Sequence, residues 1–126
     1  MKRKGIYFER DLLERLWKRG FAAVRVAGSG ATSHPSPDIV AGNGLKFIAL
    51  EVKMRRNLPL YLPENEVNQL VDFSRTFGAE PYLALKLPRK DWKFLPLSDL
   101  KRTSRGYMVD EENYLAAMKL EQILGT

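Results

Sequence analysis

The sequence predicts an α/β domain with a small mixed central β-sheet of about five strands flanked by helices. Segments with helical and with strand periodicity follow one another in the order α-β-β-β-α-β-β-α, which is typical of helices packed on a sheet. The 126 residues suffice for one domain with its own core, and 44% of them are hydrophobic. We therefore treat residues 1–126 as a single domain.

The first helix is predicted over Ile6–Arg19 and ends at Gly20. At 100° per residue, Glu9 falls on the apolar face of this helix. A carboxylate that faces a core needs a partner. A metal site would supply one, directly or through water, and an ion pair with Arg10 or Arg15 is the alternative. The apolar face is expected to contain Leu12, Leu13, Leu16 and Trp17.

The next predicted elements are a strand over Phe21–Ala27, the polar loop Gly28–Ser36 and a β-hairpin. The hairpin is predicted because Asn43-Gly44, the strongest short turn signal, separates two strand-like runs. The first run is Asp38–Ala41 and the second is Leu45–Lys53. As a two-residue loop, Asn43-Gly44 would pair Gly42 with Leu45.

In that register Asp38 lies opposite Ala49 and diagonal to Glu51, at roughly 7–8 Å. Because side chains alternate along a strand, Asp38, Glu51 and Lys53 then share one face. The opposite face is apolar and is expected to be a core. It collects Ile39, Ala41, Ile48, Leu50 and Val52.

The remaining elements follow from turn and capping signals. After a basic connection over Met54–Leu62, a second helix is predicted over Pro63–Phe77, with Pro63 in its first turn. Its apolar face is expected to include Phe77. Two further strands are predicted over Glu80–Leu87 and Asp91–Leu97, and a third helix is predicted from Asp110 to Gly125.

Composition restricts the partners and the compartment. Lys and Arg number 21 against 15 Asp and Glu, and the net charge of +6 favours a polyanionic partner. Cysteine is absent, which excludes disulfides and zinc–thiolate sites and is typical of the reducing cytoplasm. No apolar run approaches the roughly 18–20 residues of a membrane span, and charged residues interrupt any signal peptide. We expect an intracellular, cytoplasmic protein with no membrane partner.

The charged face of the hairpin has the chemistry of a phosphodiesterase. Hydrolysis of a phosphodiester needs an activated water, neutralised phosphate charge and help for the leaving oxygen. Magnesium supplies much of this and prefers oxygen ligands. Asp38 and Glu51 are suitable ligands, with the carbonyl of Val52 as a third, and Lys53 can orient the water or a phosphate oxygen. The alternative is a solvated strand face with an ordinary Glu-x-Lys pair.

Other residues are candidates because of their place in the chain. The loop before Asp38 brings Ser29, Thr32 and Ser33 toward the same site, where they could contact a phosphate, although for each of them singly a flexible surface loop is the favoured explanation. His34, the only histidine, and Gln69 have incidental explanations too. Basic residues flank the predicted site, which favours a DNA track. We predict DNA contacts for Lys4, Arg10, Arg25, Arg55 and Arg56.

With these motifs the chain resembles the PD-(D/E)xK nuclease superfamily, through Pro37-Asp38 and Glu51-Val52-Lys53. More narrowly, it resembles the archaeal Holliday junction resolvases over nearly its whole length. The superfamily motif alone is loose, but the combination of motifs is specific. The matching segments are Lys4–Leu12, Gly20-Phe21, Val24–Ser29, Asp38–Ala41, Glu51–Lys53 and Phe73–Gly78 followed by Pro81.

The resemblance implies a restriction-endonuclease-like fold and a homodimer that binds four-way DNA junctions by structure. It implies paired symmetric nicks made with magnesium or manganese, without a small-molecule cofactor, and association with the nucleoid through DNA. The catalytic set would be Glu9, Asp38, Glu51 and Lys53 with a loop serine, Ser29 or Ser33. Glu9, Asp38 and Glu51 would organise the metal.

Two alternatives compete with a junction resolvase. A non-catalytic, structure-specific DNA-binding module would use the same basic surface, and there a metal would be irrelevant. A restriction- or repair-type nuclease of the same fold would share the site but cut other substrates.

A homodimer requires a self-complementary apolar patch on each protomer. The predicted third helix offers more apolar residues than one core-facing stripe needs, so we place the patch there. The alternative is that both of its faces pack on the parent domain. The residues concerned are Tyr114, Leu115, Ala117, Met118, Leu120, Ile123 and Leu124.

Overall fold

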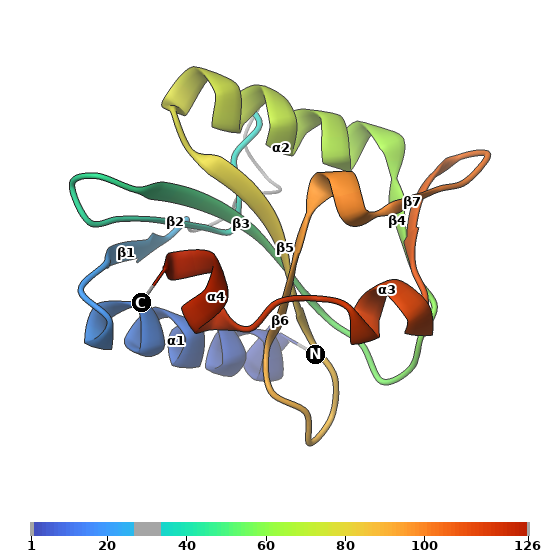
Figure 1. The fold of residues 1–126 in the computed structure, drawn as a ribbon, viewed down its shortest axis with the longest axis horizontal. Coiled ribbons are helices and arrows are strands. Elements are labelled where there is room, and N and C mark those ends of the chain that lie inside the picture. Colours follow the sequence, from blue (N-terminus) through green and yellow to red (C-terminus); the bar gives the residue numbers. More distant parts are fainter. Residues whose placement is uncertain (1, 27–33, 126) are drawn as a thin grey trace.

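A computed structural model, which describes residues 2–26 and 34–125, shows a central sheet between two helical layers (Figure 1). In this view α2 covers the sheet from above, and α1 and α4 lie below it. None of the helices in the described ranges is long and apolar enough to cross a membrane. The elements are α1 Lys2–Lys18, β1 Ala22–Arg25, β2 Ile39–Gly42, β3 Phe47–Met54, β4 Leu60–Pro63, α2 Glu64–Phe77, β5 Glu80–Lys86, β6 Lys93–Pro96, the 3₁₀ turn η1 Leu97–Asp99, β7 Lys101–Arg102, β8 Gly106–Val109, α3 Glu111–Leu115 and α4 Leu120–Leu124.

The central sheet has five strands in the order β1-β2-β3-β5-β6, which confirms the predicted mixed α/β architecture. β3 and β5 are parallel because the chain crosses between them through α2, and the other pairs are antiparallel. Each face of the sheet has its own core. The core between the sheet and helices α1 and α4 includes Leu12, Leu16, Ile39, Ile48, Leu50, Phe94 and Ile123. The core between the sheet and α2 includes Val67, Leu83, Leu85 and Leu95.

The predicted hairpin register is wrong by two residues. Gly42 pairs with Phe47 and Val40 pairs with Ala49, so the loop has four residues and not two. Asn43 causes the difference, because its side-chain oxygen accepts hydrogen bonds from the N–H groups of Leu45 and Lys46, at 2.9 and 2.6 Å. A shift of two residues preserves the alternation of side chains, so the predicted core face is still the buried one.

A second sheet, with strand order β4-β8-β7, was not predicted. Its strands have only two to four residues, too few for a clear alternation of apolar and polar positions. It contains Pro63, which is the residue before α2 and not a member of its first turn. The pairing of Pro63 with Gly106 is close, because a Cβ on Gly106 would lie 2.1 Å from the carbonyl oxygen of Leu62. This contact fixes the start of α2.

The predicted third helix is two short helices, α3 and α4. The chain between them is extended, because Met118 forms two backbone hydrogen bonds with Phe94 of β6, at 2.8 and 2.9 Å. The predicted dimer patch is also wrong, since most of its side chains pack on the parent domain. Tyr114, Ala117, Leu120, Ile123 and Leu124 are buried, and Leu115 is the large apolar side chain of the set that is exposed.

Smaller corrections concern helix limits and faces. α1 begins at Lys2, four residues before the predicted Ile6. Trp17, expected in the core, is 55% exposed because its indole N–H donates to the carbonyl of Ala23 across the turn after the helix, at 3.1 Å. Phe77, also expected in the core, is 54% exposed and stacks on Phe73 with ring centres 5.2 Å apart.

Candidate active site

Asp38 is held at the beginning of β2 by two backbone contacts with β3. Its N–H donates to the carbonyl of Leu50 at 3.0 Å, and its Oδ2 accepts from the N–H of Val52 at 2.8 Å. Because Ile39 pairs with Leu50, Asp38 lies opposite Glu51 and not opposite Ala49. The corrected register therefore brings the two carboxylates into the direct cross-strand position, which is closer than the predicted diagonal.

Lys53 completes the group on the same face of β3. Its ammonium Nζ lies 3.8 Å from Oε2 of Glu51 and 2.5 Å from Oε1 of Glu66, a residue in the first turns of α2. The Lys53 and Glu51 side chains are only 19% and 20% exposed. The hairpin and the helix thus build one partly buried cluster of charges.

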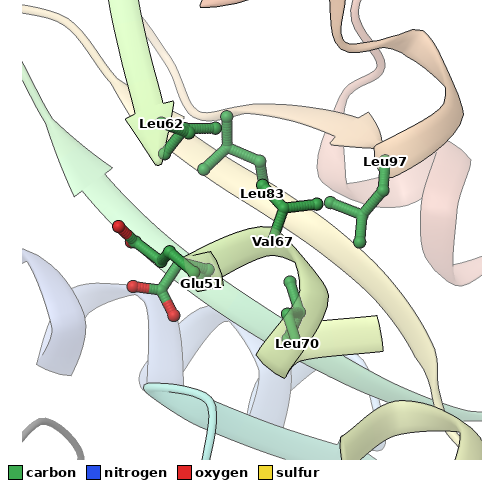
Figure 2. A pocket seen from close by; sticks show the side chains of 7 residues that line it. Glu51, Leu62, Val67, Leu70, Leu83 and Leu97 are labelled. Carbon is green, nitrogen blue, oxygen red and sulfur yellow. The ribbon is translucent and has the colours of Figure 1, made fainter. Parts of the chain in front are cut away.

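Glu51 lines an apolar recess between β3, β5 and α2 (Figure 2). Leu83 of β5, Val67 of α2 and Glu66 also line this recess. Carboxylates lose hydration in such surroundings. The remaining lining side chains are those of Leu62, Leu70 and Leu97.

Burial raises the pKa of Glu51 to about 9, and the negative charge of Asp38 adds to the effect. A hydrogen bond with Glu66 raises the pKa further, whereas Lys53 lowers it. Neighbouring carboxylates that share one region of low dielectric resist ionising together. A cation placed between Asp38 and Glu51 would relieve this repulsion.

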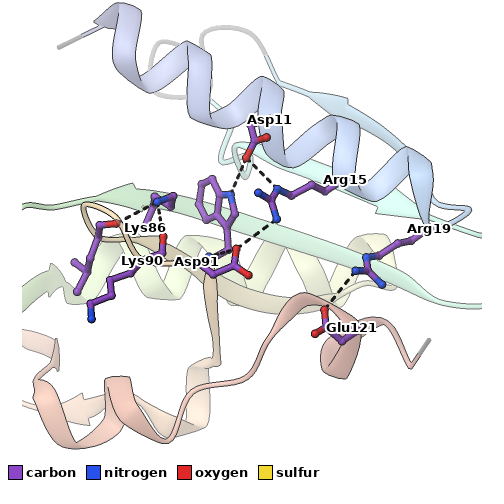
Figure 3. Close-up of polar contacts among 9 residues, drawn as sticks. Asp11, Arg15, Arg19, Lys86, Lys90, Asp91 and Glu121 are labelled. Atoms are coloured by element: carbon purple, nitrogen blue, oxygen red, sulfur yellow. Dashed lines mark hydrogen bonds and ion pairs between the residues drawn. The ribbon is translucent and has the colours of Figure 1, made fainter.

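Glu9 lies near this cluster on α1. Burial raises the pKa of its carboxyl group, and so does the charge of Asp38, so the two carboxylates are within electrostatic reach of each other. The Glu9 carboxylate forms an ion pair with Arg25 of β1, at 3.5 Å. Neither Arg10 nor Arg15 is that partner. Arg15 instead binds Asp11 and Asp91, at 3.0 and 3.3 Å (Figure 3).

The other residues predicted to contact DNA or to take part in the site are exposed, partly enclosed or outside the described residues. Ser29, Thr32 and Ser33 and the side chain of Lys4 lie outside the described residues. Arg10, Arg55 and Arg56 are exposed, as a DNA contact requires, and so are His34 and Gln69. Arg25 is more enclosed, at 29% side-chain exposure, because it pairs with Glu9.

Glu66 is the member of the cluster that the sequence analysis missed. Acidic residues in the first turn of a helix are ordinarily explained by the helix dipole, so Glu66 did not stand out as a site residue. The signal was nevertheless present, since Glu66 precedes Leu70 by four residues and shares its helical face. The argument from helical periodicity that selected Glu9 would also have selected Glu66.

The donor atoms suit a hard divalent cation. Asp38 and Glu51 offer carboxylate oxygens side by side, and the chain has no cysteine. Within residues 2–26 and 34–125, no three His, Asp or Glu side chains are arranged to hold an ion together. Two carboxylates are nonetheless the usual protein contribution to a magnesium site, since magnesium retains several waters and uses substrate phosphates.

Comparison with known proteins identifies the family to which this sequence is similar. The family model described as archaeal Holliday junction resolvase (Hjc) matches residues 1–126. The crossover junction endodeoxyribonuclease Hjc of Archaeoglobus fulgidus is 58% identical over 125 residues, covering 99% of this chain and 92% of the relative. The enzyme of the same name from Methanocaldococcus jannaschii is 32% identical over 123 residues, covering 98% and 88%.

A solved structure agrees in fold. The 1.6 Å structure of Archaeoglobus fulgidus Hjc, described as a Holliday junction resolvase from an archaeal hyperthermophile, superimposes with a TM-score of 0.92. The match covers 94% of this chain and 97% of that one, at 57% identity. The fold is thus the restriction-endonuclease-like arrangement that the resemblance implied. From these matches, the chain belongs to the archaeal Holliday junction resolvase (Hjc) family.

Proposed function

We propose that this protein is a structure-selective endodeoxyribonuclease that resolves four-way DNA junctions by paired nicks, with magnesium as its cofactor and manganese able to replace it. The observation that carries the proposal is the placement of Asp38 opposite Glu51, beside Lys53. The names of the relatives, crossover junction endodeoxyribonucleases, supply the substrate. Such a substrate would place the protein with the DNA in the cytoplasm.

Each residue of the site would have a separate role in hydrolysis. Asp38 and Glu51 would hold the cation, together with the carbonyl of Val52, and Glu9 would act through water. When bound, the cation supplies an acidified water and neutralises phosphate charge. Lys53, whose ammonium lies 3.8 Å from Glu51, would orient the attacking water or hold a phosphate oxygen. The attacking water would lose a proton as its oxygen bonds to phosphorus, the bond from phosphorus to one ester oxygen would break, and that oxygen would take up a proton, so that the nick has one phosphate end and one hydroxyl end.

Exposed arginines supply the attraction for DNA. Arg55 and Arg56 directly continue β3 beyond Lys53, so positive charge extends from the catalytic strand onto the surface. Phosphate contacts of this kind give affinity without sequence preference. Recognition of the junction would then depend on the distance between two such positively charged surfaces, one on each protomer.

A homodimer provides that spacing, because a two-fold axis places two sites on opposing strands of a pseudo-symmetric junction. The exposed apolar side chains of Val24, Phe47 and Phe77 are better candidates for the interface than the C-terminal helices. These side chains are 58%, 40% and 54% exposed. On the side of the sheet that bears Phe47, the main contacts of α2 with the central sheet fall on β3 and β5. The half of that side formed by β1 and β2 thus lies away from the main contacts of α2.

Phe47→Asp is expected to convert the dimer to a monomer, because it places a charge in an apolar interface that must exclude water. Sedimentation at micromolar protein measures this directly. Leu115→Asp is the matched control, since Leu115 is 69% exposed at the rejected location and should leave the dimer intact. A wild-type monomer that binds junctions one-to-one would contradict the dimer.

The proposed activity is tested with labelled duplex, flap, Y-shaped and four-way DNA, each incubated with magnesium, with manganese or with chelator. We expect paired nicks in the four-way junction only, and none in chelator. Cleavage of flaps or duplex would indicate a repair- or restriction-type nuclease. Binding without nicks in either metal would indicate a non-catalytic DNA-binding module.

A further inference from the structure

Lys53 has two carboxylate neighbours, and the nearer one is not in the Glu-x-Lys motif. The ammonium is 2.5 Å from Glu66 Oε1 and 3.8 Å from Glu51 Oε2. Both members of the shorter pair are largely enclosed, at 19% and 26% side-chain exposure. An ion pair in such surroundings is screened less than a surface pair.

Glu66 is held in place by structure that does not depend on Lys53. Its backbone lies in α2, whose neighbouring residues Val67 and Leu70 are buried against the sheet. The start of the helix is fixed by a hydrogen bond from the N–H of Glu64 to the carbonyl of Arg105, at 3.3 Å. Glu66 therefore offers a carboxylate from a rigid element.

The contact between Glu66 and Lys53 is an attraction of charges at short distance. The Oε1 atom of Glu66 is buried and has no hydrogen bond of good direction, although the ammonium lies within ion-pair distance. Because desolvated charge is costly unless it is paired, each of these groups restrains the other.

We infer that Glu66 is a positioning residue of the active site, which holds the ammonium of Lys53 in place for the attacking water and the phosphate. The inference rests on the proposed nuclease function. A lysine side chain is long and flexible, and its ammonium is useful to catalysis only where its place is fixed. Without Glu66, the ammonium of Lys53 would pair with Glu51 alone, and it would compete with the cation for the Glu51 carboxylate.

Glu66→Gln tests this with little change of shape. Under enzyme excess, the rate of junction nicking should fall about 10- to 100-fold, as when a residue that orients a functional side chain is lost. The affinity for the junction, measured in chelator, should not change. Glu66→Asp keeps the charge and should recover part of the rate. Glu64→Gln, on the same helix but paired with Arg102 at the surface, should nick as the wild type does.

A double-mutant cycle separates positioning from packing. The free energies of unfolding of Glu66→Gln, Lys53→Met and the double variant are compared with that of the wild type. We expect a non-additive result, because the two side chains are in direct contact: Lys53→Met removes the ammonium that pairs with Glu66, so the loss of the Glu66 carboxylate should cost less stability in that background than in the wild type.

The nicking rates and the double-mutant cycle together decide whether Glu66 positions Lys53. A Glu66→Gln variant with the wild-type nicking rate, or an additive cycle, would overturn it while leaving the nuclease proposal standing. A wild-type protein that nicks no junction would overturn the proposed function and this role for Glu66 together.

Discussion

Replacing Asp38 by asparagine, or Glu51 by glutamine, is expected to abolish the nicking of four-way junctions while the junction remains bound. Both substitutions keep the shape of the side chain and remove one negative charge. The hydrogen bond that Asp38 accepts from the N–H of Val52, at 2.8 Å, can be retained by the amide oxygen, so the strands should keep their places. The loss would therefore reflect the cation site and not the fold.

The rate should fall by at least roughly 10²–10³, the usual loss when one preorganised electrostatic contact to a transition state is removed. Binding should be equal or tighter, because each variant makes the surface that meets the phosphates more positive. Nicking of end-labelled junctions under enzyme excess measures the first effect, and gel shifts in chelator measure the second.

Asp72→Asn is a suitable control, since Asp72 is exposed on α2 and pairs with Arg75 at the surface. It should nick at the wild-type rate. If Asp38→Asn or Glu51→Gln did the same, the assignment of the site would be wrong. If either variant lost junction binding as well, the carboxylates would have a structural role and not a catalytic one.

Alternation along the chain was enough to predict the charged face of the hairpin. The core face of β2 and β3 is buried as expected, and Asp38, Glu51 and Lys53 share the other face. The predicted register was nevertheless wrong, because Asn43-Gly44 was assigned a two-residue turn. The side chain of Asn43 instead closes a four-residue loop by accepting two backbone hydrogen bonds. Local turn preference cannot distinguish these loops when both keep the same face buried.

Contacts between distant segments were the part that the sequence did not reveal. Met118 pairs with Phe94 and thereby divides the C-terminal helix, although the local residues favour a continuous one. Glu66 reaches Lys53 only because α2 crosses over β3 on its way to β5. Helical periodicity marks Glu66 as facing the sheet, but the residue that it meets depends on tertiary structure.

The last prediction concerns stability in the absence of metal, which should fall as the pH rises from 5 toward 9. Burial and the charges of Asp38 and Glu66 raise the pKa of Glu51 from 4.5 to about 9. Between these two values the folded protein retains a proton that the unfolded chain has lost. Rising pH therefore favours the unfolded chain, and the free energy of unfolding decreases. Glu9 acts in the same direction, because its pKa is also raised.

Glu51→Gln isolates this effect, because glutamine resembles the protonated acid and does not titrate. In chelator the variant should be more stable than the wild type by roughly 1–4 kcal/mol at pH 8 and about equally stable at pH 5. Urea unfolding at the two pH values measures the difference. Glu64→Gln, a surface carboxylate of the same helix as Glu66, should not alter the dependence on pH.

Magnesium should reverse the wild-type loss at pH 8, because a cation that binds the ionised carboxylates stabilises the folded state by mass action. It should stabilise Glu51→Gln much less, since one of its two proposed side-chain ligands is gone. Equal stabilisation of both proteins would place the cation elsewhere. A wild-type stability that does not fall between pH 5 and 8 would show that neither burial nor the charge of Asp38 opposes the ionisation of Glu51, and the argument for a cation between the two carboxylates would fail with it.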